Sequence, residues 1–274
     1  MSVIIGIDVG GSTTKIAGYH STGVLIDLLR VTATDPVTSV YGALGRFLSQ
    51  AQLSLQQVGH IILTGVGASH FDGDIYGIPT SRVTEFEAIG LGGLSLSGKD
   101  AAVVVSMGTG TAFVKADKNG VAHIGGSGVG GGTISGLCEK LTGVSNYEML
   151  HQMSENGDLS NVDLSVGDIS KNSIGKLNAA ATASNFGKLE DNVTNADLVR
   201  GVYNMVFQTI GMLAVFACQN STVQDVVLTG TLTASPLARQ VFDMLETMYQ
   251  VKFIVPEHAA FATSIGAVLS YMKQ

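Results

Sequence analysis

The hydrophobic pattern at the start of the chain predicts three strands, a helix and a fourth strand. Apolar and β-branched residues fill 3–9, about 14–20 and 24–32, and short turns rich in Gly and Ser separate these runs. Residues 37–53 carry apolar positions at helical spacing, and 60–64 form a short apolar run that ends in glycine. This order predicts an antiparallel meander followed by a helix and a buried strand, a βββαβ unit.

The same plan begins again near residue 100. Apolar runs at 101–105 and 112–116 flank a glycine turn, and Lys118-Asn-Gly120 is a strong hairpin signal. The remaining pattern predicts helices at about 133–142, 196–219, 236–249 and 259–272, strands at 225–229 and 251–255, and a polar segment at 154–176. We therefore expect two domains, 1–96 and 97–274, with a closing helix that could pack back on the first.

Each predicted domain opens with an apolar strand that runs into a glycine-rich turn. The first spans Ile4 to Lys15 around Gly-Gly-Ser-Thr, and the second spans Val103 to Phe113 around Gly-Thr-Gly-Thr. A turn without side chains lets the backbone approach a phosphate, while N–H and hydroxyl groups point at its oxygens. One such turn is more often a plain hairpin, and neither matches the P-loop or the Rossmann pattern. Their repetition predicts two hairpins that grip a nucleoside triphosphate.

The charge balance limits the partners of this protein. The 274 residues contain 15 Lys and Arg against 22 Asp and Glu, a net charge of −7, and no basic cluster occurs along the chain. This balance argues against nucleic acid as a partner. An acidic protein that binds a nucleotide must supply positive potential through backbone N–H groups, helix N-termini and a metal ion. The composition therefore favours Mg²⁺ as a cofactor.

The cysteines and the N-terminus predict an ordinary reduced, cytoplasmic protein. Cys138 and Cys218 lie far apart in apolar helical patterns, and the six histidines show no metal-ligand spacing. The first residues enter a strand without a signal-peptide pattern. The apolar stretch 205–218 is interrupted by polar residues and is shorter than a membrane span, so it predicts a core or interface helix and no membrane partner.

A third glycine-rich segment, His123 to Leu137, is too rich in glycine to be a simple connector. It runs into a helix whose first turn holds Thr133, and a helix N-terminus offers unpaired N–H donors to an anion. It is therefore interpreted as an anion cradle, although a flexible hinge would also explain its glycines. A strand that ends in Thr-Gly-Thr at 229–231 is either a further nucleotide contact or a plain strand-to-helix turn.

A duplicated α/β unit with a phosphate hairpin in each copy resembles the actin, Hsp70 and sugar-kinase superfamily. That resemblance implies a duplicated actin-like (ribonuclease H-like) ATPase fold with ATP in the interdomain cleft. Within the superfamily the chain is similar to the type II pantothenate kinase family over nearly its whole length. The motifs that carry this similarity are at 6–15, 84–87 (Thr-Glu-Phe-Glu), 126–133, 183–187 (Ala-Ser-Asn-Phe-Gly) and 257–267.

The resemblance implies ATP- and Mg²⁺-dependent phosphorylation of the primary hydroxyl of pantothenate, the first step of coenzyme A biosynthesis, by a homodimer. The long apolar helix at 196–219 is a candidate for its interface. It makes Glu85 the catalytic carboxylate, with Glu87 as the local competitor. The residues expected to bind nucleotide are Asp8, which also holds the metal through water, Gly10, Gly11, Ser12, Thr13, Lys15, Gly108, Thr109, Gly110, Gly130, Gly131, Gly132, Thr133 and Gly230. The residues expected to bind the acceptor are Ser106, Thr109, His123 and Gly125. Lys15 could equally pair with a carboxylate.

One departure from the family bears on the substrate. The family commonly has an arginine immediately before the glycine-rich run, and the resemblance implies that it contacts the acceptor, whereas this chain has His123. An imidazole cannot make the bidentate contact of a guanidinium. Pantetheine, which lacks a carboxylate, is therefore a second candidate acceptor. The fold would also suit an N-acetylhexosamine kinase, an ATPase activator of a reductase or, more remotely, a sugar-responsive regulator.

Overall fold

The computed structural model describes residues 2–32, 35–170, 179–189, 191–219 and 221–273. Those residues contain two five-stranded sheets with the same topology, ordered β3-β2-β1-β4-β5 in sheet 1 and β8-β7-β6-β11-β12 in sheet 2. In each sheet the first three strands in the chain pair antiparallel, and the two later strands pair parallel. The second half of the chain thus repeats the first, and the predicted duplicated fold is confirmed.

The strands of sheet 1 are β1 (Val3–Val9), β2 (Thr13–His20), β3 (Leu25–Thr32), β4 (Val58–Thr64) and β5 (Thr80–Arg82). Those of sheet 2 are β6 (Ala101–Met107), β7 (Thr111–Asp117), β8 (Gly120–Ser127), β11 (Asp225–Thr229) and β12 (Lys252–Ile254), while β9 (Leu164–Ser165) and β10 (Thr182–Ser184) form a separate pair. The α-helices are α1 (Pro36–Gln50), α2 (Glu85–Ser97), α3 (Gly131–Thr142), α4 (Tyr147–Asn156), α5 (Val166–Ile169), α6 (Asn195–Gln219), α7 (Pro236–Tyr249) and α8 (Ala262–Met272). Short 3₁₀ helices are η1 (Leu55–Gln57), η2 (Val66–His70), η3 (Leu159–Asn161), η4 (Thr231–Ala234) and η5 (Ala259–Phe261).

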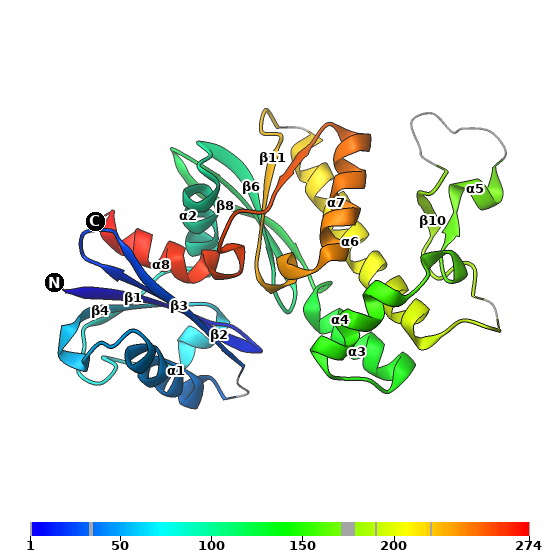
Figure 1. The fold of residues 1–274 in the computed structure, drawn as a ribbon. Helices are drawn as coiled ribbons and strands as arrows, with labels where there is room; N and C mark the ends of the chain where they lie inside the picture. The colour runs from blue at the N-terminus through cyan, green and yellow to red at the C-terminus, as the bar shows by residue number, and fades with distance from the viewer. Residues whose placement is uncertain (1, 33–34, 171–178, 190, 220, 274) are drawn as a thin grey trace.

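Sheet 1 has a helix on each face (Figure 1). Alternate residues of a strand point to opposite faces, so Val3, Ile5 and Ile7 of β1 pack with Phe47 and its neighbours on α1. Ile4 points the other way and packs with residues of α8, the last helix of the chain. The C-terminal helix therefore covers the sheet made by the N-terminal residues.

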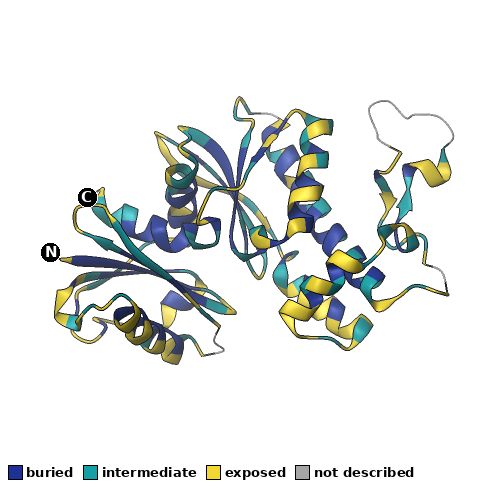
Figure 2. Cartoon of the chain, in the orientation of Figure 1, coloured by how far each residue is buried: buried dark blue, intermediate teal, exposed yellow. Residues whose placement is uncertain are grey.

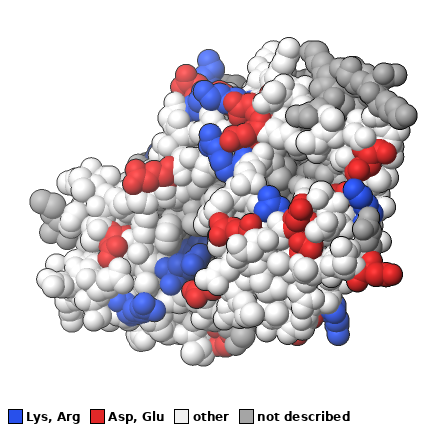
Figure 3. Space-filling model, turned by 45° about the vertical axis from the view of Figure 1, so that its right-hand side comes forward, with Lys and Arg blue, Asp and Glu red and all other residues white. Residues whose placement is uncertain are grey.

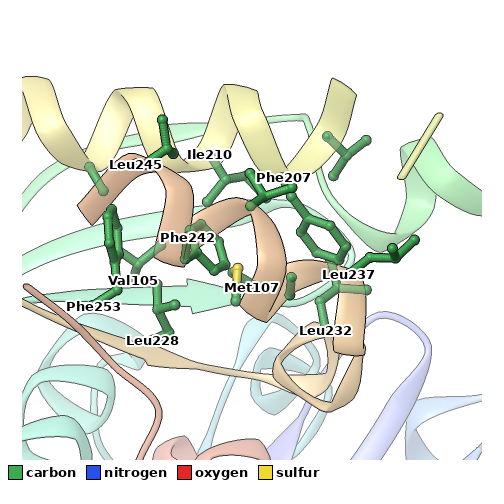
Figure 4. Close-up of a cluster of buried hydrophobic side chains, with 14 of the residues drawn as sticks. Val105, Met107, Phe207, Ile210, Leu228, Leu232, Leu237, Phe242, Leu245 and Phe253 are labelled. Carbon is green, nitrogen blue, oxygen red and sulfur yellow. The ribbon is translucent and has the colours of Figure 1, made fainter. Parts of the chain in front are cut away.

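Sheet 2 is covered on one face by α6 and α7 and on the other by α2. Leu237, Val241, Phe242 and Leu245 follow the spacing of one helix face and place the buried side of α7 on the sheet. Figure 4 shows the aromatic rings of this core between the two helices and the sheet, where Phe242 and Phe253 stack with centroids 5.0 Å apart. Burial of each such ring contributes roughly 1.5–3 kcal/mol.

Helix α6 is a core helix of this second half. It is long and apolar enough to cross a membrane by length and composition, but 61% of its most apolar window is buried inside the fold. Figure 2 shows buried residues along most of its length. Its inward residues, among them Tyr203, Phe207 and Ile210, belong to the large core of sheet 2. The hydropathy of α6 is thus accounted for by packing within the protein.

The two halves meet where α2 crosses α8. A Cβ on Gly266 of α8 would overlap the carbonyl oxygen of Ala88, and one on Gly92 of α2 would overlap the carbonyl oxygen of Ala262. Only glycine permits this backbone-to-backbone approach at both positions. The crossing brings the first turn of α2 to the carboxyl ends of the strands of sheet 1, which is where the candidate site forms.

Several predicted boundaries change in the structure. The glycine-rich segment after residue 120 begins as strand β8 and enters α3 at Gly131 rather than 133, and the closing helix is preceded by the 3₁₀ turn η5. The polar segment at 154–176 contains η3, β9 and α5, while its residues 171–176 lie outside the described residues. In each case local hydrogen bonding produces an element that apolar periodicity does not mark.

Candidate active site

The two glycine hairpins face each other at their tips. The hydroxyl oxygens of Ser12 and Thr109 lie 3.4 Å apart although 97 positions separate them in the chain. A Cβ on Gly11 would stand 3.7 Å from the same Thr109 hydroxyl. Each tip is closed by a backbone hydrogen bond, from the Gly10 N–H to the Thr13 carbonyl and from the Gly108 N–H to the Gly110 carbonyl. The fold therefore brings together the two predicted phosphate turns.

A buried ion pair lies directly behind the first tip. Asp8 on β1 and Lys15 on β2 are partners in the antiparallel register, with carboxylate and ammonium 3.6 Å apart and each side chain 9% exposed. Burial raises the pKa of Asp8, while the Lys15 charge and its hydrogen bond oppose that rise. Of the two roles left open for Lys15, pairing with a carboxylate is the one present in the structure.

Glu85 joins this pair as the first residue of α2. The N-cap Thr84 accepts a hydrogen bond from the Glu87 N–H at 3.3 Å, which fixes the start of the helix. Burial raises the pKa of Glu85, the negative charge of Asp8 raises it further, and Lys15 opposes both. Glu87 is exposed, so Glu85 is the carboxylate of this turn that shares a buried environment with Asp8 and Lys15.

A half-buried carboxylate with a raised pKa is suited to accept a proton. General bases work best when their pKa approaches the working pH, and burial beside another carboxylate produces that shift. Burial and Asp8 shift the pKa of Glu85 in this direction, and Glu85 lies on the side of sheet 1 that faces the second half of the chain. The arrangement can therefore activate a hydroxyl group beside the two glycine hairpins.

The glycine-rich run holds the second hairpin through its backbone. The N–H groups of Gly131 and Gly132 donate to the carbonyls of Gly108 and Thr109, both at 2.9 Å. A Cβ on Gly130 would stand 2.7 Å from the Thr109 carbonyl oxygen. The glycines are therefore needed for close packing between α3 and the hairpin.

The first turn of α3 is closed by its own threonine. The Gly130 N–H donates to the Thr133 hydroxyl at 3.2 Å, and that hydroxyl donates to the carbonyl of Gly128 at 3.1 Å. The N–H groups of residues 130–132 thus all have protein acceptors in this conformation. A direct contact between these three donors and an anion stays a prediction and requires them to exchange partners.

Gly230 has a counterpart in the first half that sequence reasoning missed. Gly65 and Gly230 follow the ends of β4 and β11, have φ of +86° and +91°, and each precedes a 3₁₀ helix. A Cβ on Gly65 would stand 2.7 Å from an Asp8 carboxylate oxygen, and one on Gly230 would overlap the Met107 carbonyl. The shared Leu-Thr-Gly at 63–65 and 228–230 is the signal that identifies the pair.

The predicted acceptor residues come from the strands of sheet 2. His123 on β8 is exposed and stacks on Phe86, with ring centroids 3.9 Å apart and planes 12° from parallel. Because Phe86 follows Glu85, the stack joins β8 to the start of α2. Ser106 is half-buried at the end of β6, and Gly125 lies opposite Phe113 in the β7–β8 ladder. Phe86 is a contact that no sequence pattern indicated.

A cavity of about 330 Å³ borders the first hairpin on the α1 side. Its lining includes Gly10, Gly11, Thr14 and Ser39, and the hydroxyl oxygens of the last two lie 2.6 Å apart.

Among the described residues no group of three or more His, Cys, Asp or Glu could hold a metal ion. A magnesium ion between the two hairpins would therefore rely on the Asp8 carboxylate, water and phosphate oxygens, which is a usual ligand set for Mg²⁺.

Comparison with protein families and curated sequences gives a consistent result. The Fumble family profile matches residues 101–270. A type II pantothenate kinase of Oceanobacillus iheyensis is 31% identical over 277 aligned residues, which cover 97% of this chain and 98% of that protein. A type II pantothenate kinase of Bacillus thuringiensis subsp. konkukian is 28% identical and covers 98% of both chains.

Solved structures show the same fold at low sequence identity. The activator of the 2-hydroxyisocaproyl-CoA dehydratase from Clostridium difficile with bound ADPNP aligns with a TM-score of 0.72 at 15% identity, over 99% of this chain and 94% of that one. A ROK family protein from Streptococcus pneumoniae in complex with sucrose aligns with a TM-score of 0.62 at 13% identity, over 99% and 98% of the two chains. These similarities concern the fold alone.

Proposed function

The chain belongs to the Fumble family of type II pantothenate kinases, and we propose that it transfers the γ-phosphoryl group of ATP to the primary hydroxyl of pantothenate. The observation that carries this proposal is the cluster of Glu85, Asp8 and Lys15 beside two facing glycine hairpins. Pantothenate is the acceptor because the curated relatives that match nearly the whole chain are named for it.

In the proposed reaction Glu85 orients the acceptor hydroxyl and takes its proton. The acceptor oxygen bonds to the γ-phosphorus, the bond from that phosphorus to the β–γ bridging oxygen breaks, and ADP leaves with the electron pair. Phosphoryl transfer needs little covalent chemistry from the protein beyond such positioning and charge stabilisation. General-base assistance of this kind typically contributes about 10²–10⁴ in rate.

ATP is proposed to lie between the halves 1–96 and 97–274, which act as two domains. The hairpin residues 10–13 and 108–110 would bind its phosphates, and the backbone around 130–133 and Gly230 would border the rest of the nucleotide. Asp8 is suited to bind Mg²⁺, because its buried carboxylate lies near the end of β1 and forms an ion pair with Lys15 alone among the described residues. When bound, Mg²⁺ neutralises phosphate charge. The Lys15 charge opposes the rise in the pKa of Asp8 that burial causes, and so favours the ionised carboxylate.

We also propose that the protein is a cytoplasmic homodimer. Helix α6 is mostly buried, but Leu213 and Phe216 on it are exposed, and such apolar residues support a role of this helix in an interface. Size-exclusion chromatography with light scattering tests this state. A mass near 28 kDa, that of one chain, would refute it.

The function itself is tested by ADP release in the presence of Mg²⁺, with pantothenate, pantetheine and N-acetylhexosamines as acceptors. Release stimulated by pantothenate supports the proposal. Stimulation only by another acceptor would refute pantothenate while leaving a kinase, and release without any acceptor would favour an ATPase activator. The two cysteines, Cys138 and Cys218, are both buried and free, which does not favour a cysteine-ligated cluster.

A further inference from the structure

Strand register places three charged side chains in a row across sheet 1. Asp8 on β1 pairs with Lys15 on β2, and Lys15 pairs with Arg30 on β3. Residues paired in register point to the same face of a sheet. Leu29 and Val31, the neighbours of Arg30, pack with the α1 core on the opposite face. Arg30 therefore lies on the face that carries the acidic cluster.

Arg30 differs from Lys15 in its surroundings. Lys15 is buried and paired, whereas Arg30 is exposed and forms no ion pair with any residue that the structure describes. Its charge nevertheless interacts with Tyr147 on α4, in the second half of the chain. Burial raises the pKa of Tyr147, and the positive charge of Arg30 opposes that rise. Arg30 thus shares a face of sheet 1 with Lys15, and its charge interacts with a residue of the second half. Figure 3 shows acidic and basic side chains interspersed over the face in view.

The protein's own charges at the candidate site supply no counter-ion for an anionic acceptor. Two carboxylates, those of Asp8 and Glu85, stand against the single ammonium of Lys15. A carboxylate that loses water beside them without a cation of its own is strongly disfavoured. His123 lies flat against Phe86 and lacks the fork of parallel N–H donors that binds a carboxylate. Arg30 has that fork.

The distance from Asp8 to Arg30 across the strands matches the length of pantothenate. Two strand spacings of about 4.8 Å place the backbone of Arg30 about 10 Å from that of Asp8. Pantothenate joins its primary hydroxyl to its carboxylate through about eight bonds, or about 10 Å when extended at ~1.2 Å per bond. A hydroxyl held near Glu85 therefore leaves the carboxylate within reach of the Arg30 side chain.

We propose that Arg30 binds the carboxylate of the acceptor and so determines the preference for an anionic over a neutral acceptor. This inference rests on the proposed function. The reacting end of the acceptor stays with Glu85, and Arg30 holds the far end from the edge strand of sheet 1. Arg30 is then a specificity residue for substrate binding and takes no part in proton transfer.

Steady-state kinetics of Arg30→Gln with pantothenate and with pantetheine as acceptors test this proposal. We expect the KM for pantothenate to rise about tenfold, equivalent to ~1.4 kcal/mol, while kcat and the KM for ATP stay within about twofold. The KM for pantetheine should not change, because it has no carboxylate. Arg30→Lys keeps the charge without the fork and should raise the KM for pantothenate about threefold.

Arg46→Gln is the matched control, since Arg46 is exposed on α1 and lies on the other side of sheet 1. It removes the same charge and should leave all constants unchanged. If Arg30→Gln changed the KM for both acceptors equally, or changed neither, the role of Arg30 would be overturned. Pantothenate turnover by the wild type would still support the proposed function in that case. A wild type that does not phosphorylate pantothenate refutes the proposed function and this inference together.

Discussion

Two ion pairs in this protein allow burial to be compared with distance as a source of stability. Lys15 and Asp8 are 3.6 Å apart and 9% exposed, whereas Lys99 and Asp225 are only 2.8 Å apart but 33% and 29% exposed. We predict that Lys15→Met destabilises the fold far more than Lys99→Met. Methionine keeps an unbranched apolar stem close in size to that of lysine and lacks the charged group.

The expected sizes follow from the geometry. At an effective dielectric constant of about 20, charges at the Lys15–Asp8 distance attract by about 5 kcal/mol, before the cost of their desolvation. Removing one partner of a buried pair leaves the other charge uncompensated and typically costs about 3–5 kcal/mol. A partly exposed pair such as Lys99–Asp225 contributes about 0.2–1 kcal/mol. The Lys15–Asp8 pair, although longer, is therefore expected to contribute more to stability than the Lys99–Asp225 pair.

The stability lost in Lys15→Met should also depend on pH, because Asp8 becomes neutral when it takes up a proton. Burial already raises the folded-state pKa of Asp8 above its ordinary value of 3.8, and loss of Lys15 removes an opposing effect. The folded state then binds the proton more tightly than the unfolded chain, so stability falls as the pH rises from near 4 through the folded-state pKa. The variant should be least stable near neutral pH and recover part of its stability in acid.

Thermal unfolding without nucleotide, at pH 7.5 and pH 5, measures both effects. At neutral pH we expect the midpoint to fall by roughly 10 °C for Lys15→Met and by less than about 3 °C for Lys99→Met. Equal shifts for the two variants would refute the reasoning from burial. A deficit of Lys15→Met that grows on acidification would refute the assignment of the effect to the Asp8 charge.

The remaining predictions concern Glu85 and the helix crossing. Glu85→Gln should lower kcat by about 10²–10⁴ with ATP binding retained, whereas Glu87→Gln should stay within a few-fold; comparable losses in turnover assays would reject Glu85 as the base. Because burial and Asp8 raise the pKa of Glu85, kcat/KM should fall with decreasing pH through a pKa above the ordinary value of 4.5, and a pH–rate profile with no acid limb above 4.5 would contradict this. Gly266→Ala should destabilise the fold by at least about 1–3 kcal/mol, because its Cβ would overlap the Ala88 carbonyl. Gly136→Ala, in open space on α3, should stabilise the fold by roughly 0.5–1 kcal/mol. Denaturant titration of both variants measures these free energies, and equal values would contradict the packing argument.

The fold could be predicted from the sequence where apolar periodicity and glycine turns act together. The two hairpins and the repeated strand order follow from β-branched runs that end in glycine, and α7 follows from its helical spacing. Helix α2 carries no such signal, because Gly90, Gly92 and Gly93 interrupt it and it is buried between two sheets. Its glycines lower helix propensity and are tolerated only because tertiary contacts require them.

The candidate site was predictable in its parts and not in its contacts. Glu85 and Glu87 have the same chemistry and lie two positions apart on one helical turn, and only tertiary burial beside Asp8 distinguishes them. The stack of Phe86 on His123 joins two elements that no local pattern relates. Packing between the halves creates these differences, and single-sequence patterns record only local preferences.

The glycine crossing of α2 and α8 has a consequence for motion. At Gly92 and Gly266 the two helices touch through backbone, while the buried side chains of Ala88, Ala267 and Val268 pack beside the crossing. The contact at the far end, between the hydroxyls of Ser12 and Thr109, is a single exposed one at 3.4 Å. We therefore expect the halves to separate first at the hairpin tips, while the close-packed crossing at Gly92 and Gly266 stays together and acts as the hinge.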